Sequence, residues 1–139
     1  ARGDSYPKRR GLTRVKELVN NGNNVAFAQD SIADYWYPLG NGNMMNILDN
    51  GIHLAHYTHI DEINKALDLI TYYGANIMRV NDEYGIEVGK PANFIVLDAQ
   101  DPYEAIRERA EVLMSIRNGK YLFKREPRKN EVEIDFLKQ

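Results

Sequence analysis

Two periodicities of apolar and polar residues divide the chain near residue 83. Before that point, apolar residues recur with helical spacing, which predicts a short helix near Val15 and a longer helix over 43–57. Between them, the apolar run 24–28 has the length and the β-branched and aromatic content of a buried strand in a parallel sheet. This alternation of helix and strand is typical of an α/β fold.

The next stretch carries signals for helix boundaries. Thr58 and Asp61 have the spacing of a capping box and predict the start of a helix, and Gly74 predicts its end. We expect one further helical segment over 75–80.

The pattern becomes mostly β after Glu83. An Asn-Gly pair at 118–119, between two apolar runs, is a strong signal for a β-hairpin. One helical excursion is expected over 103–109. The expected strands are 85–89, 92–98, 112–116 and 121–124.

Composition and charge narrow the class of protein. The 139 residues are 43% hydrophobic and 27% charged, as in an ordinary globular domain. The net charge of −2 provides no field for polyanions, so we expect no nucleic-acid partner and interpret the basic clusters at 8–10 and 124–129 as solvated surface. No apolar run approaches the roughly 18 residues of a membrane span. The absence of cysteine excludes disulfides and a Cys-based zinc site.

The start of the chain indicates a piece of a longer protein. Ala1 stands where an initiator Met is expected, and residues 1–11 have the composition of the middle of a loop. No signal peptide opens the chain, and we expect a cytoplasmic location.

Asp30 is the strongest candidate for chemistry. It directly follows the apolar run 24–28, and reactive groups of α/β barrels come from the C-terminal ends of strands. A carboxylate at such a position can bind a metal, transfer protons, or both. The alternative is an aspartate that caps the following turn.

Aromatic and histidine residues are weaker candidates. Trp36, between two tyrosines on the loop after Asp30, can stack on a flat ring, or it can cover a barrel mouth or a subunit contact. His53, His56 and His59 recur every three residues, so a helix places neighbouring members side by side. No carboxylate completes a ligand set near them before Asp61, and we expect surface or packing roles.

Two parts of the chain resemble the amidohydrolase superfamily. Thr71–Ala75 and Tyr84–Asp98 resemble the closing signature of these enzymes, although Asn93 stands where aspartate is usual. Tyr6–Glu17 and Phe27–Met44, centred on the Trp-Tyr-Pro-Leu-Gly run at 36–40, resemble bacterial cytosine deaminases.

This resemblance implies a fold, a cofactor and roles for residues. Residues 1–83 are expected to be the C-terminal portion of a (β/α)8 TIM-type barrel, and residues 84–139 part of a small β-sandwich. Asp30 is implied as a catalytic residue and as a ligand of one divalent transition metal, iron or zinc, and Trp36 as a pocket wall against the pyrimidine. The remaining ligands are expected in the missing N-terminal part of the same enzyme, and we expect a homo-oligomer.

Ser31 is a departure from the family pattern. In the cytosine deaminases the metal-ligating aspartate follows a histidine and precedes a second aspartate near the substrate, whereas this chain reads Gln29-Asp30-Ser31. A hydroxyl in place of an acceptor-only carboxylate changes which exocyclic groups a pocket tolerates. We therefore include Ser31 among the substrate-binding residues.

The predicted activity is hydrolytic deamination of a small N-heterocycle. Cytosine, converted to uracil and ammonia, is the first choice of substrate, and creatinine is the alternative. A non-catalytic structural piece of a split or nicked amidohydrolase is a further alternative. The aromatic run at 36–40 argues against a hydantoinase-like enzyme that opens a cyclic amide.

Overall fold

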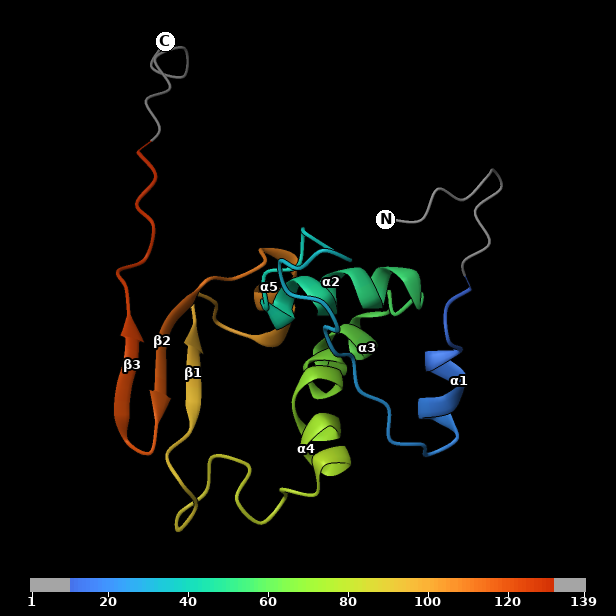
Figure 1. Ribbon diagram of the computed structural model, residues 1–139, viewed down its shortest axis with the longest axis horizontal. Helices are drawn as coiled ribbons and strands as arrows, with labels where there is room; N and C mark the ends of the chain where they lie inside the picture. Colours follow the sequence, from blue (N-terminus) through green and yellow to red (C-terminus); the bar gives the residue numbers. More distant parts are fainter. Residues whose placement is uncertain (1–10, 132–139) are drawn as a thin grey trace.

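A computed structural model describes residues 11–131 of the chain (Figure 1). Its helices are α1 (Val15–Asn20), α2 (Met44–Leu54), α3 (Ile60–Lys65), the 3-10 helix η1 (Ala66–Ile70), α4 (Tyr72–Met78) and α5 (Pro102–Arg107). Its strands are β1 (Phe94–Leu97), β2 (Val112–Arg117) and β3 (Lys120–Lys124). Figure 1 shows the three strands side by side at one side of the molecule, with the helices grouped beside them.

The predicted helix over 43–57 forms as α2, with a polar residue at its start. The Asn43 side chain accepts a hydrogen bond from the N–H of Met45, which satisfies one of the free donors of the first turn. The helix ends at Leu54, and His56 beyond it has the left-handed φ of 57° that reverses the chain.

The predicted capping box at Thr58 and Asp61 is wrong by one residue. The N-cap of α3 is His59, whose Nδ1 accepts from the N–H of Asp61 at 3.4 Å. The reciprocal bond runs from the N–H of His59 to Oε2 of Glu62 at 3.2 Å. An imidazole nitrogen thus performs the acceptor role that the sequence pattern assigned to a hydroxyl.

Gly74 does not end a helix, which corrects a second boundary. It lies inside α4, and the break comes earlier, at Thr71, where φ is −127° and ψ is −93°. The helix α4 ends instead at Met78, and the next residue, Arg79, has a left-handed φ of 58°. The packing of η1 against α2 and α4 outweighs the preference of glycine for helix ends.

The predicted hairpin is confirmed. Strand β2 pairs antiparallel with β1 and with β3 in the order β1-β2-β3. Arg117 and Lys120 are paired across a two-residue turn, in which Asn118 and Gly119 have φ of 49° and 74°. Positive φ at both positions is what a hairpin turn of this length requires, and Asn-Gly adopts it at low cost.

The predicted strand 85–89 is wrong, because the backbone there forms turns around one lysine. Nζ of Lys90 donates to the carbonyl oxygens of Tyr84 at 2.7 Å and Asn81 at 3.2 Å, and lies 3.2 Å from Oε1 of Glu87. These bonds satisfy all three donors of the ammonium group and hold the segment in a compact turn.

The predicted strand 24–28 is also wrong within the part of the chain that the structure describes. The segment is half-buried and irregular, and the N–H of Phe27 donates to the carbonyl oxygen of Leu69 at 2.8 Å. A parallel strand needs a neighbouring strand for its backbone groups, and residues 11–131 place none beside it. Apolar content alone therefore does not produce a strand here.

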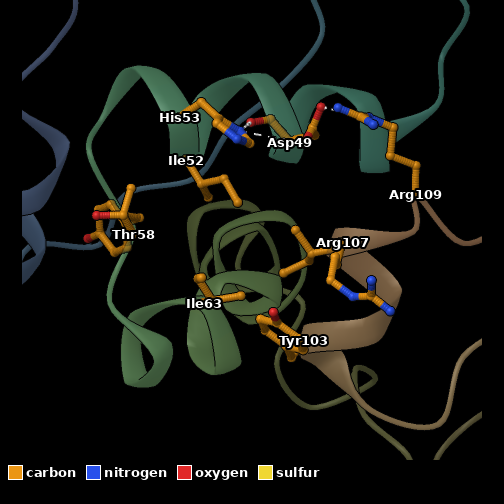
Figure 2. Close-up of a pocket in the computed structure, with 10 residues that line it drawn as sticks. Asp49, Ile52, His53, Thr58, Ile63, Tyr103, Arg107 and Arg109 are labelled. Atoms are coloured by element: carbon orange, nitrogen blue, oxygen red, sulfur yellow. Dashed lines mark hydrogen bonds and ion pairs between the residues drawn. The ribbon is translucent and has the colours of Figure 1, made fainter.

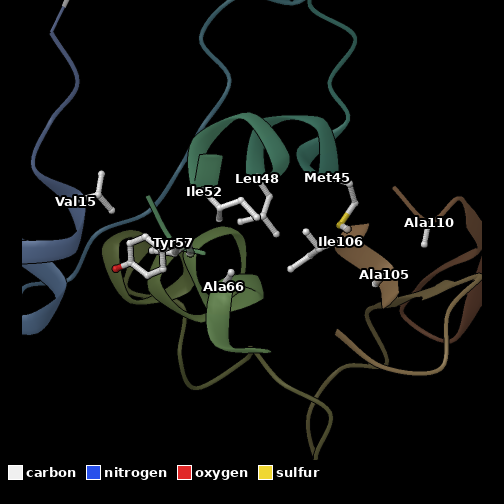
Figure 3. Close-up of a cluster of buried hydrophobic side chains, with 10 residues drawn as sticks. Val15, Met45, Leu48, Ile52, Tyr57, Ala66, Ala105, Ile106 and Ala110 are labelled. Atoms are coloured by element: carbon white, nitrogen blue, oxygen red, sulfur yellow. The ribbon is translucent and has the colours of Figure 1, made fainter. Parts of the chain in front are cut away.

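Helix α2 carries the centre of the hydrophobic core (Figure 3). Leu48 is completely buried, and burial of a leucine side chain contributes about 2 kcal/mol. Ala66 and Leu69 of η1 and Ile106 of α5 pack in the same cluster. Helix α5 lies between β1 and β2 in sequence, so the helical and β parts of the chain share this core.

Among the helices of residues 11–131, none has the length and apolar content needed to cross a bilayer.

Candidate active-site loop

Asp30 is positioned by the segment that precedes it. Phe27 fixes this segment through its backbone bond to Leu69 and through its ring, which packs against the backbone of α2 at Gly51. A Cβ atom at Gly51 would lie 2.5 Å from Cε2 of Phe27, so only glycine permits this approach. Asp30 itself is exposed and comes three residues after the anchored Phe27.

Residues 31–42 form a loop that follows Asp30 and is called the Trp36 loop below. The side chain of Gln29 joins the two ends of this loop. Its Nε2 donates to the carbonyl oxygen of Ser31 at 3.0 Å, and its Oε1 accepts from the N–H of Gly42 at 3.0 Å. One planar amide thereby bridges backbone groups at both ends of the loop.

Gly40 completes the base of the Trp36 loop. It is the buried residue of an otherwise largely exposed segment. A Cβ atom there would lie 2.0 Å from the carbonyl oxygen of Ser31 and 2.6 Å from Nε2 of Gln29. The loop closes on itself so tightly that no side chain fits at this position.

The tip of the loop is held by Asp34. Its Oδ1 accepts from the N–H groups of Trp36 and Tyr37, each at 2.9 Å, in an Asx-type turn. The N–H of Tyr37 is the largest cause that holds the pKa of Asp34 below its ordinary value, and Ser31 and Trp36 contribute in the same direction. The aspartate is therefore ionised, and the turn that presents Trp36 is stable, at neutral pH.

The three predicted site residues lie on one continuous stretch of the chain. Asp30 and Ser31 are consecutive, and Trp36 is at the tip of the loop that they begin. Trp36 is 73% exposed, so it does not fill the core of residues 11–131. Its exposure leaves its face free for a ring or for another part of the protein.

Asp30 is one candidate metal ligand, and the described residues hold no complete metal centre. Within residues 11–131, no three His, Asp or Glu side chains come together as a set that could hold a metal ion. Asp30 is exposed after an anchored segment, and its carboxylate oxygens are of the type that divalent cations bind.

The three histidines have local structural contacts. Nδ1 of His53 lies 2.7 Å from the carbonyl oxygen of Asp49 on the same helix. His59 caps α3, and the carbonyl oxygen of His56 accepts from Nζ of Lys16 at 3.1 Å. These contacts agree with the surface and packing roles expected for them.

A cavity of about 290 Å³ lies between α2, α3 and α5 (Figure 2). Asp49 on its rim accepts from Nε of Arg109 at 2.9 Å, and Arg107 pairs with Glu108 at 2.6 Å. The cations at this cavity are thus already paired with carboxylates. Its lining includes none of the predicted site residues.

Comparison with known proteins decides the family. A sequence model described as the amidohydrolase family matches residues 1–123. The chain belongs to the amidohydrolase family. The resemblance drawn from the motifs around Trp36 and Tyr84–Asp98 is confirmed.

Three known proteins are similar to this chain in sequence. 5-Methylcytosine deaminase from Klebsiella pneumoniae, solved with 5-fluorocytosine, is 50% identical with a TM-score of 0.87, over 94% of this chain and 32% of that one. N-isopropylammelide isopropyl amidohydrolase from Pseudomonas sp. (strain ADP) is 37% identical, over 81% of this chain and 28% of that protein. Pterin deaminase from Rhizobium rhizogenes (strain K84 / ATCC BAA-868) is 26% identical, over 84% and 26%.

A more distant solved structure agrees in fold. N-isopropylammelide isopropylaminohydrolase from Burkholderia multivorans ATCC 17616 is 23% identical, with a TM-score of 0.74 over 84% of this chain and 30% of that one. The chain spans no more than about a third of the length of any of these relatives.

The sequence patterns alone did not reveal two residues that shape the site. Gln29 and Gly40 contact each other and the Ser31 carbonyl, although the spacing of residue types carries no signal for these contacts. The one available hint was Gln29 itself, a residue with both a donor and an acceptor directly before the candidate aspartate.

Proposed function

We propose that the enzyme containing this chain is a metal-dependent hydrolytic deaminase of a cytosine-type ring. The observation that carries the proposal is the 50% identity to 5-methylcytosine deaminase over 94% of the chain. Two further relatives are named as an amidohydrolase and as a deaminase of other nitrogen heterocycles, isopropylammelide and pterin. Cytosine and its 5-methyl derivative are the first substrates to test.

The proposal includes the wider architecture. Residues 1–83 would be the last part of a (β/α)8 barrel, with Asp30 at its C-terminal face, where barrel enzymes hold their active sites. Residues 84–139 would belong to a β-sandwich, of which β1, β2 and β3 form one sheet. The partner of this chain is the remaining part of the same enzyme, and we propose that the whole forms a homo-oligomer.

Asp30 is the proposed metal ligand and proton acceptor. Iron or zinc fits a mixed set of this carboxylate and histidines supplied by the rest of the enzyme. The chemistry that the metal supplies when bound is a water molecule with a lowered pKa. Asp30 would accept a proton from water as the water oxygen bonds to the ring carbon, and would pass this proton to the amino nitrogen, so that the C–N bond breaks and ammonia leaves.

Trp36 and Ser31 are the proposed substrate contacts. The indole face of Trp36, held by the Asp34 turn, packs on the flat ring and excludes water from it. Ser31 is shorter than aspartate and uncharged, so it leaves more room beside the ring, and its hydroxyl can donate either to Asp34 or to the substrate. This is the position at which substrate preference is expected to change most.

A chimeric enzyme tests the activity. The part of K. pneumoniae 5-methylcytosine deaminase that this chain does not cover would be joined to residues 1–139, and ammonia release would be measured with cytosine, 5-methylcytosine and creatinine. We expect turnover of at least one pyrimidine, and a loss of about a thousandfold in Asp30→Asn, the loss expected when a proton-transfer group is removed. A metal-loaded, folded chimera that releases no ammonia from either pyrimidine would overturn the proposal.

Ser31→Asp tests the substrate assignment. We expect the ratio of kcat/KM between cytosine and creatinine to change by about tenfold or more, because the variant adds a charge and removes a donor beside the ring. An unchanged ratio would show that Ser31 does not contact the substrate. Creatinine as the preferred substrate of the unmodified chimera would support the alternative deaminase.

The non-catalytic alternative is tested on the 139-residue chain itself. A single carboxylate is a weak site, so metal analysis after dialysis should find no stoichiometric transition metal bound to this polypeptide alone. Stoichiometric metal would contradict the claim that the remaining ligands come from elsewhere. A segment that neither restores activity nor raises metal content in the chimera would support a purely structural role.

A further inference from the structure

Gln29 has a geometry that the proposed roles of its neighbours do not explain. Its side chain is half-buried, directly before Asp30, and both ends of its amide are used. The donor end reaches the carbonyl oxygen of Ser31, and the acceptor end receives the N–H of Gly42. Asparagine, shorter by one methylene group, would carry the same amide but not extend as far from the backbone.

Gly40 packs against the contact between the Gln29 amide and the Ser31 carbonyl. Because a Cβ atom there would collide with the Ser31 carbonyl and with Nε2 of Gln29, the loop backbone lies directly against the amide. The base of the Trp36 loop therefore consists of the Gln29 amide, the Ser31 carbonyl and the Gly40 backbone in mutual contact. Such a base has one packed arrangement, and loosening any member frees both ends of the loop.

The tip of the loop has hydrogen bonds of its own, since Asp34 accepts from the N–H groups of Trp36 and Tyr37. A closed base and a turn-stabilised tip are the features of a compact surface loop, whose ends are close together. The orientation of Trp36 relative to Asp30 then depends on where the loop is attached, and the Gln29 side chain bonds to backbone groups at both ends of that attachment.

We propose that Gln29 is a positioning residue of the active site, whose amide closes the base of the Trp36 loop and so fixes Trp36 and Ser31 with respect to Asp30. The proposal rests on the deaminase function proposed above. Gln29 touches neither the substrate nor the metal in this assignment, and it acts through the loop. Its loss should weaken substrate binding while the metal ligand Asp30 stays in place.

Two variants of equal length separate the two hydrogen bonds. Gln29→Met removes both, whereas Gln29→Glu retains an acceptor for the N–H of Gly42 and places a carboxylate against the Ser31 carbonyl. Gln100→Met is the matched control, because Gln100 is exposed and lies on the turn before α5. All three would be made in the chimeric enzyme, with metal content measured for each.

Steady-state kinetics supply the first measurement. We expect Gln29→Met to raise KM for the pyrimidine about tenfold with a smaller change in kcat, because the loop contributes binding common to the ground and transition states. Gln29→Glu should fall between Gln29→Met and wild type, and Gln100→Met should match wild type. A KM within about twofold of wild type in Gln29→Met would overturn the proposal.

Hydrogen exchange of the Gly42 amide supplies a measurement that needs no activity. Mass spectrometry of a peptide covering 38–44 should show faster exchange in Gln29→Met and near-native exchange in Gln29→Glu, which keeps the acceptor. Equal exchange in all variants would contradict the closed base. Loss of metal from Gln29→Met would also overturn the assignment, since it would place the action of Gln29 on Asp30.

These outcomes distinguish the two proposals. An inactive wild-type chimera with native metal content removes the deaminase function and, with it, the positioning role. An active wild type whose Gln29→Met variant keeps native KM and native exchange removes the positioning role and leaves the function intact.

Discussion

Gly51→Ala offers the sharpest test of how the segment before Asp30 is held. In most helices this substitution is favourable, because alanine gains about 1 kcal/mol over glycine in helix propensity. In α2, however, the new Cβ would lie 2.5 Å from Cε2 and 2.8 Å from both Cδ2 and Cζ of Phe27. These distances are far inside van der Waals contact, so the half-buried ring, which packs against the core, must shift to admit the new atom.

The net change in stability is the cost of overpacking minus the gain in helix propensity. Overpacking a filled site costs about 1–3 kcal/mol, which exceeds the gain in propensity. We expect Gly51→Ala to lower the free energy of unfolding by about 1 kcal/mol and to shift Tm down by roughly 3 °C in a chain of this size. The strain acts on Phe27, so it should also displace the segment that carries Asp30.

Gly74→Ala is the matched control, since Gly74 also lies inside a helix but a Cβ there would meet nothing within 4 Å. It should raise the free energy of unfolding by about 0.5–1 kcal/mol. The assay is urea unfolding of the 139-residue chain, followed by circular dichroism. If both alanine variants change stability in the same direction, the close approach of Phe27 to α2 is wrong.

A double variant isolates the contact. Phe27→Leu removes ring atoms from the site, so combining it with Gly51→Ala should cost less than the sum of the single effects by about 1 kcal/mol. Additive effects would show that the cost of Gly51→Ala arises elsewhere in α2.

Two further predictions concern the ammonium groups that join segments of the chain. Lys90→Met keeps the aliphatic stem but loses the bonds to the carbonyl oxygens of Asn81 and Tyr84. Thermolysin should therefore cleave within 81–90 faster than in wild type. Lys120→Met, on the exposed strand β3, is the control and should not change this rate. Nζ of Lys16 lies 2.6 Å from Oε1 of Glu62, and this hydrogen bond lowers the pKa of Glu62. The carboxylate therefore stabilises the fold at pH values above its pKa in the unfolded chain. This contribution is lost as pH falls through its pKa in the folded chain. The difference in urea midpoint between wild type and Glu62→Gln should therefore be present at pH 7 and shrink between about pH 5 and pH 3; a constant difference would contradict the ion pair.

Local chemistry accounts for the parts of the fold that were predictable. Asn118 and Gly119 adopt the positive φ values of a two-residue hairpin turn wherever two apolar runs flank them, so the turn could be read directly. Helix α2 was equally accessible, because its apolar stripe and its Asn43 cap lie within a few turns of chain.

Competition between local signals explains the misplaced boundaries. Thr58 and His59 both offer an acceptor near the start of α3, and only the geometry of the entering chain selects His59. Gly74 has the propensity of a helix end, yet packing places the break at Thr71. In each case a preference of about 1 kcal/mol was outweighed by contacts with other elements.

In the candidate site, too, some residues could be predicted from the sequence and others could not. Asp30 is a candidate because it follows an apolar run, Trp36 because of the family resemblance, and Ser31 because it departs from the family pattern. Gln29 carries no such signal, because its contact with the N–H of Gly42 depends on a residue that residue identity alone does not place nearby.

The sequence by itself determined the family and the hairpin and named the candidate site residues, since each depends on motifs or on neighbours within a few positions. Tertiary structure decided where the chain closes on itself: Phe27 against Gly51, and Gln29 across the base of the Trp36 loop against Gly40. It also decided that residues 24–28 form no strand in the described part of the chain. The physical reason is that a buried backbone group or a close approach is settled by its partner, and the partner is far away in sequence.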